Sequence, residues 1–157
     1  MPRRFLFLLL LATLAAAEKY DGPRPPKRDL PYIKHASNLI PTEDVTAQES
    51  DKKKDDITYI IEGASSSAVT SLAEPIFLLQ ADKLIPEKLK LFKLEVKNGH
   101  REVRITARKS SAIRLEATRY DADTLWKIEV GDTLEPGEYA LSQADDESNR
   151  AFCFRVR

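Results

Sequence analysis

Few residues of this chain have the types and spacing that catalysis or metal binding requires. The most suggestive group is Glu95, His100 and Glu102, because a tight turn at Asn98-Gly99 places all three on one polar face of a hairpin. An imidazole and two facing carboxylates could bind a cation. Lysine and arginine side chains share this face, so we interpret it as an ion-paired, solvated surface and predict no metal site.

Recognisable catalytic motifs are absent from the sequence. The acidic run Asp145-Asp146-Glu147 lacks the spaced oxygen ligands and the glycine of a calcium loop. The chain contains two histidines, His35 and His100, and it has no nucleophile elbow, phosphate-binding loop or zinc-protease helix. We therefore predict that the protein is not an enzyme, with no catalytic residue, no cofactor and no metal ion.

Cys153 is the single cysteine, so no disulfide can form within the chain. It lies in an apolar run at residues 151–156, where we expect a small buried side chain; a reactive or dimer-forming thiol is the alternative. The 25 basic and 25 acidic residues give a formal net charge of zero, and basic residues do not cluster with aromatic ones. The composition thus gives no reason to expect a nucleic-acid partner.

The N-terminus has the pattern of a secretory signal peptide. Arg3 and Arg4 precede a short apolar run at residues 5–17, which ends in Ala15-Ala16-Ala17. The run is shorter than the roughly 20 residues that a membrane-spanning helix needs. We predict a signal peptide at residues 1–17, export to the periplasm or the medium, and no transmembrane segment after cleavage.

Residues 18–56 are rich in proline and charge, and we predict that they form an extended, largely disordered tether. Two apolar islands interrupt this tether. They could dock on a partner protein or on the protein's own domain, because a short apolar segment can lie along a sheet edge or in a groove. The candidate docking residues are Leu30, Pro31, Tyr32, Ile33, Leu39 and Ile40.

Residues 57–157 contain short runs that alternate between apolar and polar side chains, as strands do. Asn98-Gly99 is the preferred pair for a two-residue hairpin turn, and it sets a register in which Leu94 faces Val103 and Phe92 faces Ile105. The apolar residues that precede Phe92 have the opposite phase. This mismatch predicts a β-bulge near residue 91.

A late Pro-Gly turn leads into another strand and supplies the best evidence for the fold class. Leu134, Pro136, Gly137 and Tyr139 resemble a tyrosine corner, in which the tyrosine hydroxyl binds backbone a few residues upstream. We predict an all-β, immunoglobulin-like antiparallel β-sandwich of about seven or eight strands. A small β-barrel is the alternative.

Several stretches together resemble a group of uncharacterised bacterial secreted proteins that carry a signal peptide, a tether and a C-terminal immunoglobulin-like or fibronectin-like β-domain. The resemblance implies an exported β-domain and brings no activity with it. The matching stretches are Asp29-Leu30-Pro31-Tyr32, Ala73-Glu74-Pro75-Ile76-Phe77-Leu78, Leu94-Glu95-Val96-Lys97-Asn98-Gly99, Pro136-Gly137-Glu138-Tyr139-Ala140-Leu141 and Phe152-Cys153-Phe154.

Three functional hypotheses follow from these observations. The first is an exported, non-enzymatic interaction module that binds another envelope or secreted protein through its tether or a sheet edge. The second is a β-sandwich that binds a glycan or small ligand, with Tyr59, Tyr120 and Trp126 as the aromatic candidates. The third is a hydrolase with dispersed catalytic residues.

Overall fold

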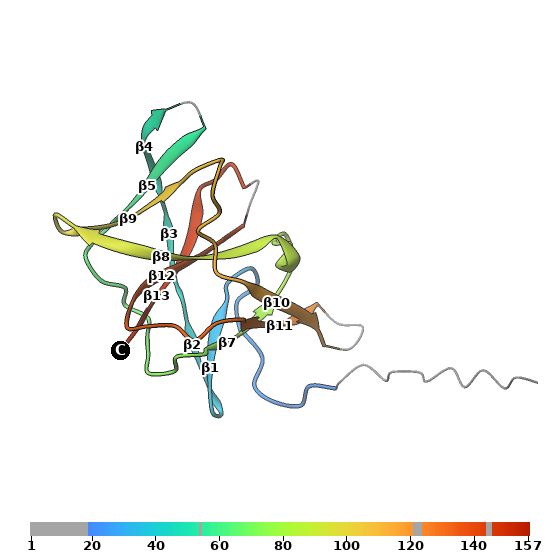
Figure 1. The fold of residues 1–157 in the computed structure, drawn as a ribbon. Helices are drawn as coiled ribbons and strands as arrows, with labels where there is room; N and C mark the ends of the chain where they lie inside the picture. The colour runs from blue at the N-terminus through green and yellow to red at the C-terminus, as the bar shows by residue number, and fades with distance from the viewer. Residues whose placement is uncertain (1–18, 54, 121–123, 144–145) are drawn as a thin grey trace, which may run out of the picture.

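The structure is a computed structural model that describes residues 19–53, 55–120, 124–143 and 146–157. These residues form two mainly antiparallel β-sheets and one turn of 3-10 helix, η1 (Pro86–Lys88). Figure 1 shows the two sheets packed against each other as the layers of a sandwich. The prediction of an all-β sandwich is confirmed, and the predicted signal peptide at residues 1–17 lies outside the described residues.

The smaller sheet has the strand order β10-β11-β7-β1-β2. Its strands are β1 (Tyr32–His35), β2 (Asn38–Pro41), β7 (Ile76–Gln80), β10 (Leu115–Arg119) and β11 (Leu125–Val130). β7 is the central strand of this sheet, and its sequence is an apolar run because both of its faces are covered. Phe77 and Leu79 pack into the core between the sheets, whereas Leu78 packs on the opposite face with Tyr20 and Tyr120.

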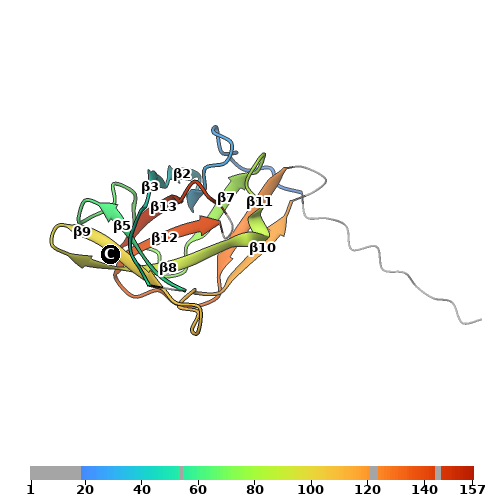
Figure 2. The ribbon, with the colours of Figure 1, turned by 90° about the horizontal axis from the view of Figure 1, so that it is seen from above.

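The larger sheet has the strand order β3-β13-β12-β8-β9-β5-β4, and β6 pairs with β13 in parallel. Its strands are β3 (Glu43–Thr46), β4 (Gln48–Lys53), β5 (Asp56–Glu62), β6 (Val69–Thr70), β8 (Leu89–Lys97), β9 (His100–Ile105), β12 (Gly137–Gln143) and β13 (Arg150–Val156). Its two edge strands, β3 and β4, are separated in the chain by Ala47 alone. The chain therefore joins the two edges of the larger sheet end to end at Ala47, so this sheet curves back on itself, and we call it the curled sheet (Figure 2). This curvature makes the larger sheet similar to a small β-barrel, which was the alternative fold predicted from the sequence.

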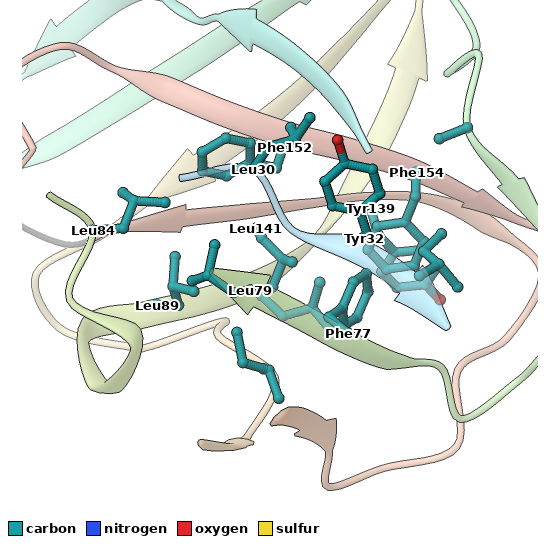
Figure 3. Packing of buried hydrophobic residues seen from close by; sticks show 14 of the residues in the cluster. Leu30, Tyr32, Phe77, Leu79, Leu84, Leu89, Tyr139, Leu141, Phe152 and Phe154 are labelled. Atoms are coloured by element: carbon teal, nitrogen blue, oxygen red, sulfur yellow. The ribbon is translucent and has the colours of Figure 1, made fainter. Parts of the chain in front are cut away.

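The main core fills the space between the two sheets. Figure 3 shows aromatic and leucine side chains from both sheets interleaved there. The rings of Phe77 and Phe154 meet edge to face with centroids 5.1 Å apart, and Tyr139 stacks on Phe154 at 5.6 Å. Such aromatic contacts contribute beyond the apolar area that they bury.

Tyr139 also makes the bond that defines a tyrosine corner. Its side chain is 1% exposed, and its hydroxyl donates to the carbonyl oxygen of Glu135 at 2.7 Å. Pro136 and Gly137 form the bend between these two residues, and Leu134 is buried in the main core just before it. The corner thus joins the turn to the start of β12.

Residues 18–56 differ from the tether that the sequence predicts, because four strands, β1 to β4, lie within this range. Leu30, Tyr32 and Ile33 are buried in the main core, where they help to close the sandwich. Asp29 fixes this segment, because its carboxylate accepts the backbone N–H groups of residues 82, 83 and 84 at 2.9 to 3.0 Å. The composition of this segment suggested disorder because β3 and β4 are polar. Both nevertheless form strands, because β3 pairs with β13 and β4 pairs with β5.

The hairpin at Asn98-Gly99 forms with left-handed φ values of 50° and 79° at its two turn residues. Pairing between β8 and β9 begins as predicted at the turn, but it ends at the pair of Glu95 and Glu102. The two predicted pairs, Leu94 with Val103 and Phe92 with Ile105, are therefore not formed, contrary to the predicted register. The predicted bulge near residue 91 is also wrong, because β8 pairs with β12 without a shift from residue 89 to residue 94.

The apolar residues of β8 change from odd-numbered to even-numbered positions because both faces of this strand are buried. Leu89 and Leu91 pack into the main core, while Phe92 and Leu94 face the interior of the curled sheet. A strand covered on both sides carries apolar residues in both phases.

Candidate functional site

In the interior of the curled sheet, alanine occupies several positions where a larger side chain would fill the space. Three successive cross-strand rows are set by the register of β8, β12 and β13. The first row is Lys90, Ser142 and Ala151, the second is Phe92, Ala140 and Cys153, and the third is Leu94, Glu138 and Arg155. Ala140 and Ala151, together with Ala47 of the β3–β4 junction, leave space that larger side chains would occupy.

This space is a cavity of about 220 Å³ in the interior of the curled sheet. Aliphatic and aromatic side chains form its walls, and polar side chains surround its mouth. We call it the sheet pocket. It is lined by Ala47, Tyr59, Ile61, Lys90, Phe92, Leu94, Val103, Ile105, Ala140, Ser142, Gln143, Asp146, Asn149 and Ala151.

The splayed ends of β8 and β9 help to form the sheet pocket. Phe92 and Leu94 of β8 and Val103 and Ile105 of β9 line it, although a continuous hairpin would bring them into direct cross-strand contact. On the opposite side, β5 contributes Tyr59. Burial raises the pKa of the Tyr59 hydroxyl, with a smaller contribution from the Glu49 carboxylate, so this ring is neutral at physiological pH.

A buried ion cluster lies in the interior of the curled sheet beyond the apolar walls. Arg101 shares its face of β9 with two wall residues and is completely buried. Its guanidinium donates to both carboxylate oxygens of Glu43, at 2.8 and 3.3 Å, and to the carbonyl oxygens of Glu62 and Gly63. Glu138, 6% exposed at its side chain, lies 4.0 Å from the guanidinium and accepts the N–H of Ser66.

Glu43 and Arg101 in this cluster are charged at neutral pH. Burial alone would raise the pKa of Glu43, but hydrogen bonds from Arg101 and Ser66 outweigh it, so the pKa lies below its usual range. Burial likewise opposes the charge of Arg101, and the Glu43 carboxylate reverses this and raises the pKa of the guanidinium. These paired charges therefore form a polar plug at this end of the interior.

Cys153 lies beside Ala140 in the second row, where it packs with the apolar residues of the curled sheet, and it is completely buried. Burial raises the pKa of its thiol to about 12. The thiolate, which is the nucleophilic form, is therefore negligible at physiological pH. This agrees with the expectation of a small buried side chain and disfavours a reactive one.

Three polar side chains at the mouth of the sheet pocket form hydrogen bonds with the backbone. The Ser142 hydroxyl donates to the carbonyl of Arg150 at 3.2 Å, and the Asp146 carboxylate accepts the N–H of Ser148 at 3.0 Å. The Gln143 side-chain carbonyl accepts the N–H of Ile85 at 2.7 Å. Lys90 forms no ion pair with any other residue that the structure describes.

The hairpin group of Glu95, His100 and Glu102 forms a surface ion-pair network with Lys97, in which His100 and Glu102 are half-buried. Lys97 lies 3.0 Å from Glu95 and 2.9 Å from Glu102, and His100 lies 3.0 Å from Glu102. Lys97 and His100 together lower the pKa of the Glu102 carboxyl. No group of three or more histidine, cysteine or acidic residues in the described ranges could hold a metal ion.

The candidate docking residues and the candidate aromatic residues do not come together. Leu30, Tyr32 and Ile33 are in the main core, and Leu39 and Ile40 of β2 are half-buried against it. Pro31 connects this segment to Thr42, whose hydroxyl donates to the Pro31 carbonyl at 2.7 Å. Among the aromatic candidates, Tyr59 lines the sheet pocket, Tyr120 is buried, and Trp126 packs against the main core.

Sequence reasoning missed the sheet pocket because its residues come from segments far apart in the chain. One signal was present: the change of phase along β8, which indicates a strand with two buried faces. The three alanines gave no signal of their own, since alanine is common in strands and loops alike.

Comparisons with protein-family models, with curated proteins and with solved structures find no match to this chain. Within the described residues, no helix has the length and apolar character needed to span a membrane.

Proposed function

We propose that the protein is an exported, non-enzymatic binding module whose ligand site is the sheet pocket. The observation that carries this proposal is an apolar cavity of about 220 Å³ with a polar mouth. Protein interiors are normally close-packed, and a void lined by apolar atoms forfeits their dispersion contacts. A bound apolar group recovers these contacts, and pockets with apolar walls and a few polar groups are typical of small-molecule sites.

Catalysis has little support in the sheet pocket. Its titratable side chains are Tyr59, Lys90 and Asp146, and these do not form a nucleophile, base and orienting group in hydrogen-bond contact. Cys153 is completely buried, does not line the sheet pocket, and is a neutral thiol at physiological pH. Binding without chemistry is therefore the function that the geometry favours.

Binding of another envelope or secreted protein remains the second candidate, and it rests on the sheet edges. Leu30, Tyr32 and Ile33 are occupied in the main core, which removes them as exposed docking residues. The outer edges of β2 and β10 end the smaller sheet and could pair with an extended partner segment. Export itself is inferred from the signal-peptide pattern of residues 1–17.

The test uses N-phenyl-1-naphthylamine, an uncharged probe whose fluorescence rises in apolar surroundings. We expect saturable binding by the purified protein. Ala140→Leu and Ala151→Leu, which fill the sheet pocket from two walls, should each weaken this binding at least tenfold. Ala64→Leu makes the same change at an exposed loop residue and should leave binding unaltered. Thermal unfolding establishes that each variant is folded, and unchanged binding in both folded pocket variants would refute the proposal.

A further inference from the structure

We infer that the β8–β9 hairpin acts as a zipper that closes and opens the sheet pocket, and that a backbone bridge between Leu91 and Ile113 holds it open. This inference rests on the proposed function and adds the regulation of that site. The sequence predicts a continuous hairpin, whereas in the structure β8 and β9 pair only near the turn.

The unpaired part of the hairpin has side chains that suit pairing. Continuing the observed register would place Leu94 opposite Val103 and Phe92 opposite Ile105. Cross-strand pairs of aliphatic and aromatic side chains stabilise antiparallel strands. In the structure all four side chains line the sheet pocket instead. Pairing would bring them into contact with each other and remove the space that they enclose.

The edge of β8 that β9 needs for this pairing is occupied at one point. Leu91 forms a bridge with Ile113, whose N–H donates to the Leu91 carbonyl oxygen at 2.8 Å. β12 covers the other edge of β8, so Ile113 and β9 share one edge. In the continued register the residue opposite Leu91 is Thr106. Ile113 and Thr106 therefore compete for the same carbonyl, and the bridge to Ile113 excludes the full hairpin.

Each arrangement has contacts that favour it. Ile113 is half-buried against the main core, which favours the open form. Closure would pair Lys93 with Arg104, whose backbone groups face the gap because alternate residues of a strand face the same edge. β5 would move with β9, because the two strands are paired as far as Ile105. A ligand in the sheet pocket shifts the balance to the open form, since the closed form has no space for it.

A disulfide can hold the closed form without changing the walls of the sheet pocket. Lys93 and Arg104 are not among the residues that line it. As a hydrogen-bonded pair their Cα atoms would lie about 5.5 Å apart, which a disulfide can bridge. We expect Lys93→Cys/Arg104→Cys to form this bond under mild oxidation and to lose binding of the naphthylamine probe until it is reduced. Cys153 does not interfere, because it is a completely buried, neutral thiol.

Glu95→Cys/Glu102→Cys is the matched control, because this pair is already formed in the structure and lies nearer to the turn. It should oxidise at least as readily and leave probe binding unchanged. Probe at ten times its dissociation constant should slow oxidation of the Lys93–Arg104 pair about tenfold, because about one-eleventh of the protein is then free of probe.

The bridge is tested by removing its donor. Ile113→Pro deletes the N–H group that binds Leu91. The closed form should gain population, so the engineered cysteine pair should oxidise faster and the probe should bind more weakly. Ser111→Pro, at an exposed position of the same connection, is the control and should change neither. Thermal unfolding establishes that each variant is folded.

The outcomes separate this inference from the proposed function. If the Lys93–Arg104 pair does not oxidise where the control pair does, or if its oxidised form binds the probe as tightly as its reduced form, the zipper is overturned while the sheet pocket stands as a binding site. If folded Ile113→Pro changes neither oxidation nor probe binding, the role of the bridge is overturned. If the probe binds equally to the protein and to the filled variants, the proposed function fails, and disulfide formation still reports whether the hairpin closes.

Discussion

Replacing Arg101 with methionine tests whether the ion cluster is the closed end of the curled sheet. Methionine keeps an unbranched stem of similar length and removes the guanidinium. Glu43 then loses both of its hydrogen bonds from Arg101, and Glu138 loses the nearby cation. The carbonyls of Glu62 and Gly63 lose their donors as well.

The structure sets the size of the expected effect. Removing one partner of a buried ion pair costs about 3 to 5 kcal/mol, because the remaining charge is left without compensation. The lower end applies here, since the Glu43 side chain keeps 22% exposure and Arg155 remains 3.8 Å from Glu138. We therefore expect Arg101→Met to lower the free energy of unfolding by about 3 kcal/mol at pH 7, measured by urea unfolding with Trp126 fluorescence.

The loss should shrink as the pH falls. In the native protein the lowered pKa of Glu43 stabilises the fold above the usual glutamate value, near 4.3, and this contribution disappears as the pH drops through the lower folded value. In the variant, burial without Arg101 should raise the pKa of Glu43, which destabilises the fold at pH 7 and less so at pH 4. Both effects make the difference in the free energy of unfolding between the native protein and the variant smaller in acid.

The control is Arg104→Met on the same strand. Arg104 is 62% exposed and pairs with Asp56 at 2.8 Å, so its loss should cost no more than about 0.5 kcal/mol. Equal effects of the two substitutions, or a loss at Arg101 that does not change between pH 7 and pH 4, would refute the account of the cluster as a buried, charged plug.

Two further predictions concern the contacts that hold the sandwich together. Tyr139→Phe should lower the free energy of unfolding by about 1 kcal/mol, because the bond to the Glu135 carbonyl is lost at a buried site; equal stability of the two proteins would reduce the corner to an ordinary turn. Asp29→Asn should cost about 1 kcal/mol at pH 7, because a charged acceptor of three backbone N–H groups becomes a neutral one. Burial raises the pKa of Asp29, but these bonds outweigh it and the net shift is downward. The difference should therefore fade as the pH drops below about 4 and through the lowered folded value, and a difference that is the same at pH 7 and pH 2 would contradict this origin.

The sequence was sufficient for the features that depend on local chemistry. Asn98 and Gly99 form the predicted tight turn because both adopt left-handed φ values at little cost. Alternation along β10 and β11 indicated strands, and these two strands pair with each other as neighbours. The apolar run around Cys153 indicated a buried strand, and β13 lies between β3 and β12 in the curled sheet.

The features that depend on distant partners were not predictable in the same way. β4 has the sequence Gln-Glu-Ser-Asp-Lys-Lys, which by composition reads as a solvated linker. It becomes a strand because β5 offers it a backbone edge, and backbone pairing does not require apolar side chains. The sheet pocket depends in turn on this closure, since Ala47 reaches the interior only where β3 passes into β4.

The interior of the curled sheet contains an apolar pocket and a buried ion cluster, and the cluster needs an explanation other than stability. Well-packed apolar side chains could replace the cluster of Arg101, Glu43 and Glu138 at similar or better stability, because desolvation offsets much of the attraction between buried charges. The cluster instead fixes geometry: the bonds of Arg101 tie β9 to β3 and to the end of β5, and so hold these strands of the curled sheet in one arrangement. We therefore expect the folded Arg101→Met variant to bind the naphthylamine probe more weakly although Arg101 does not line the sheet pocket. Unchanged affinity would limit the cluster to a role in stability.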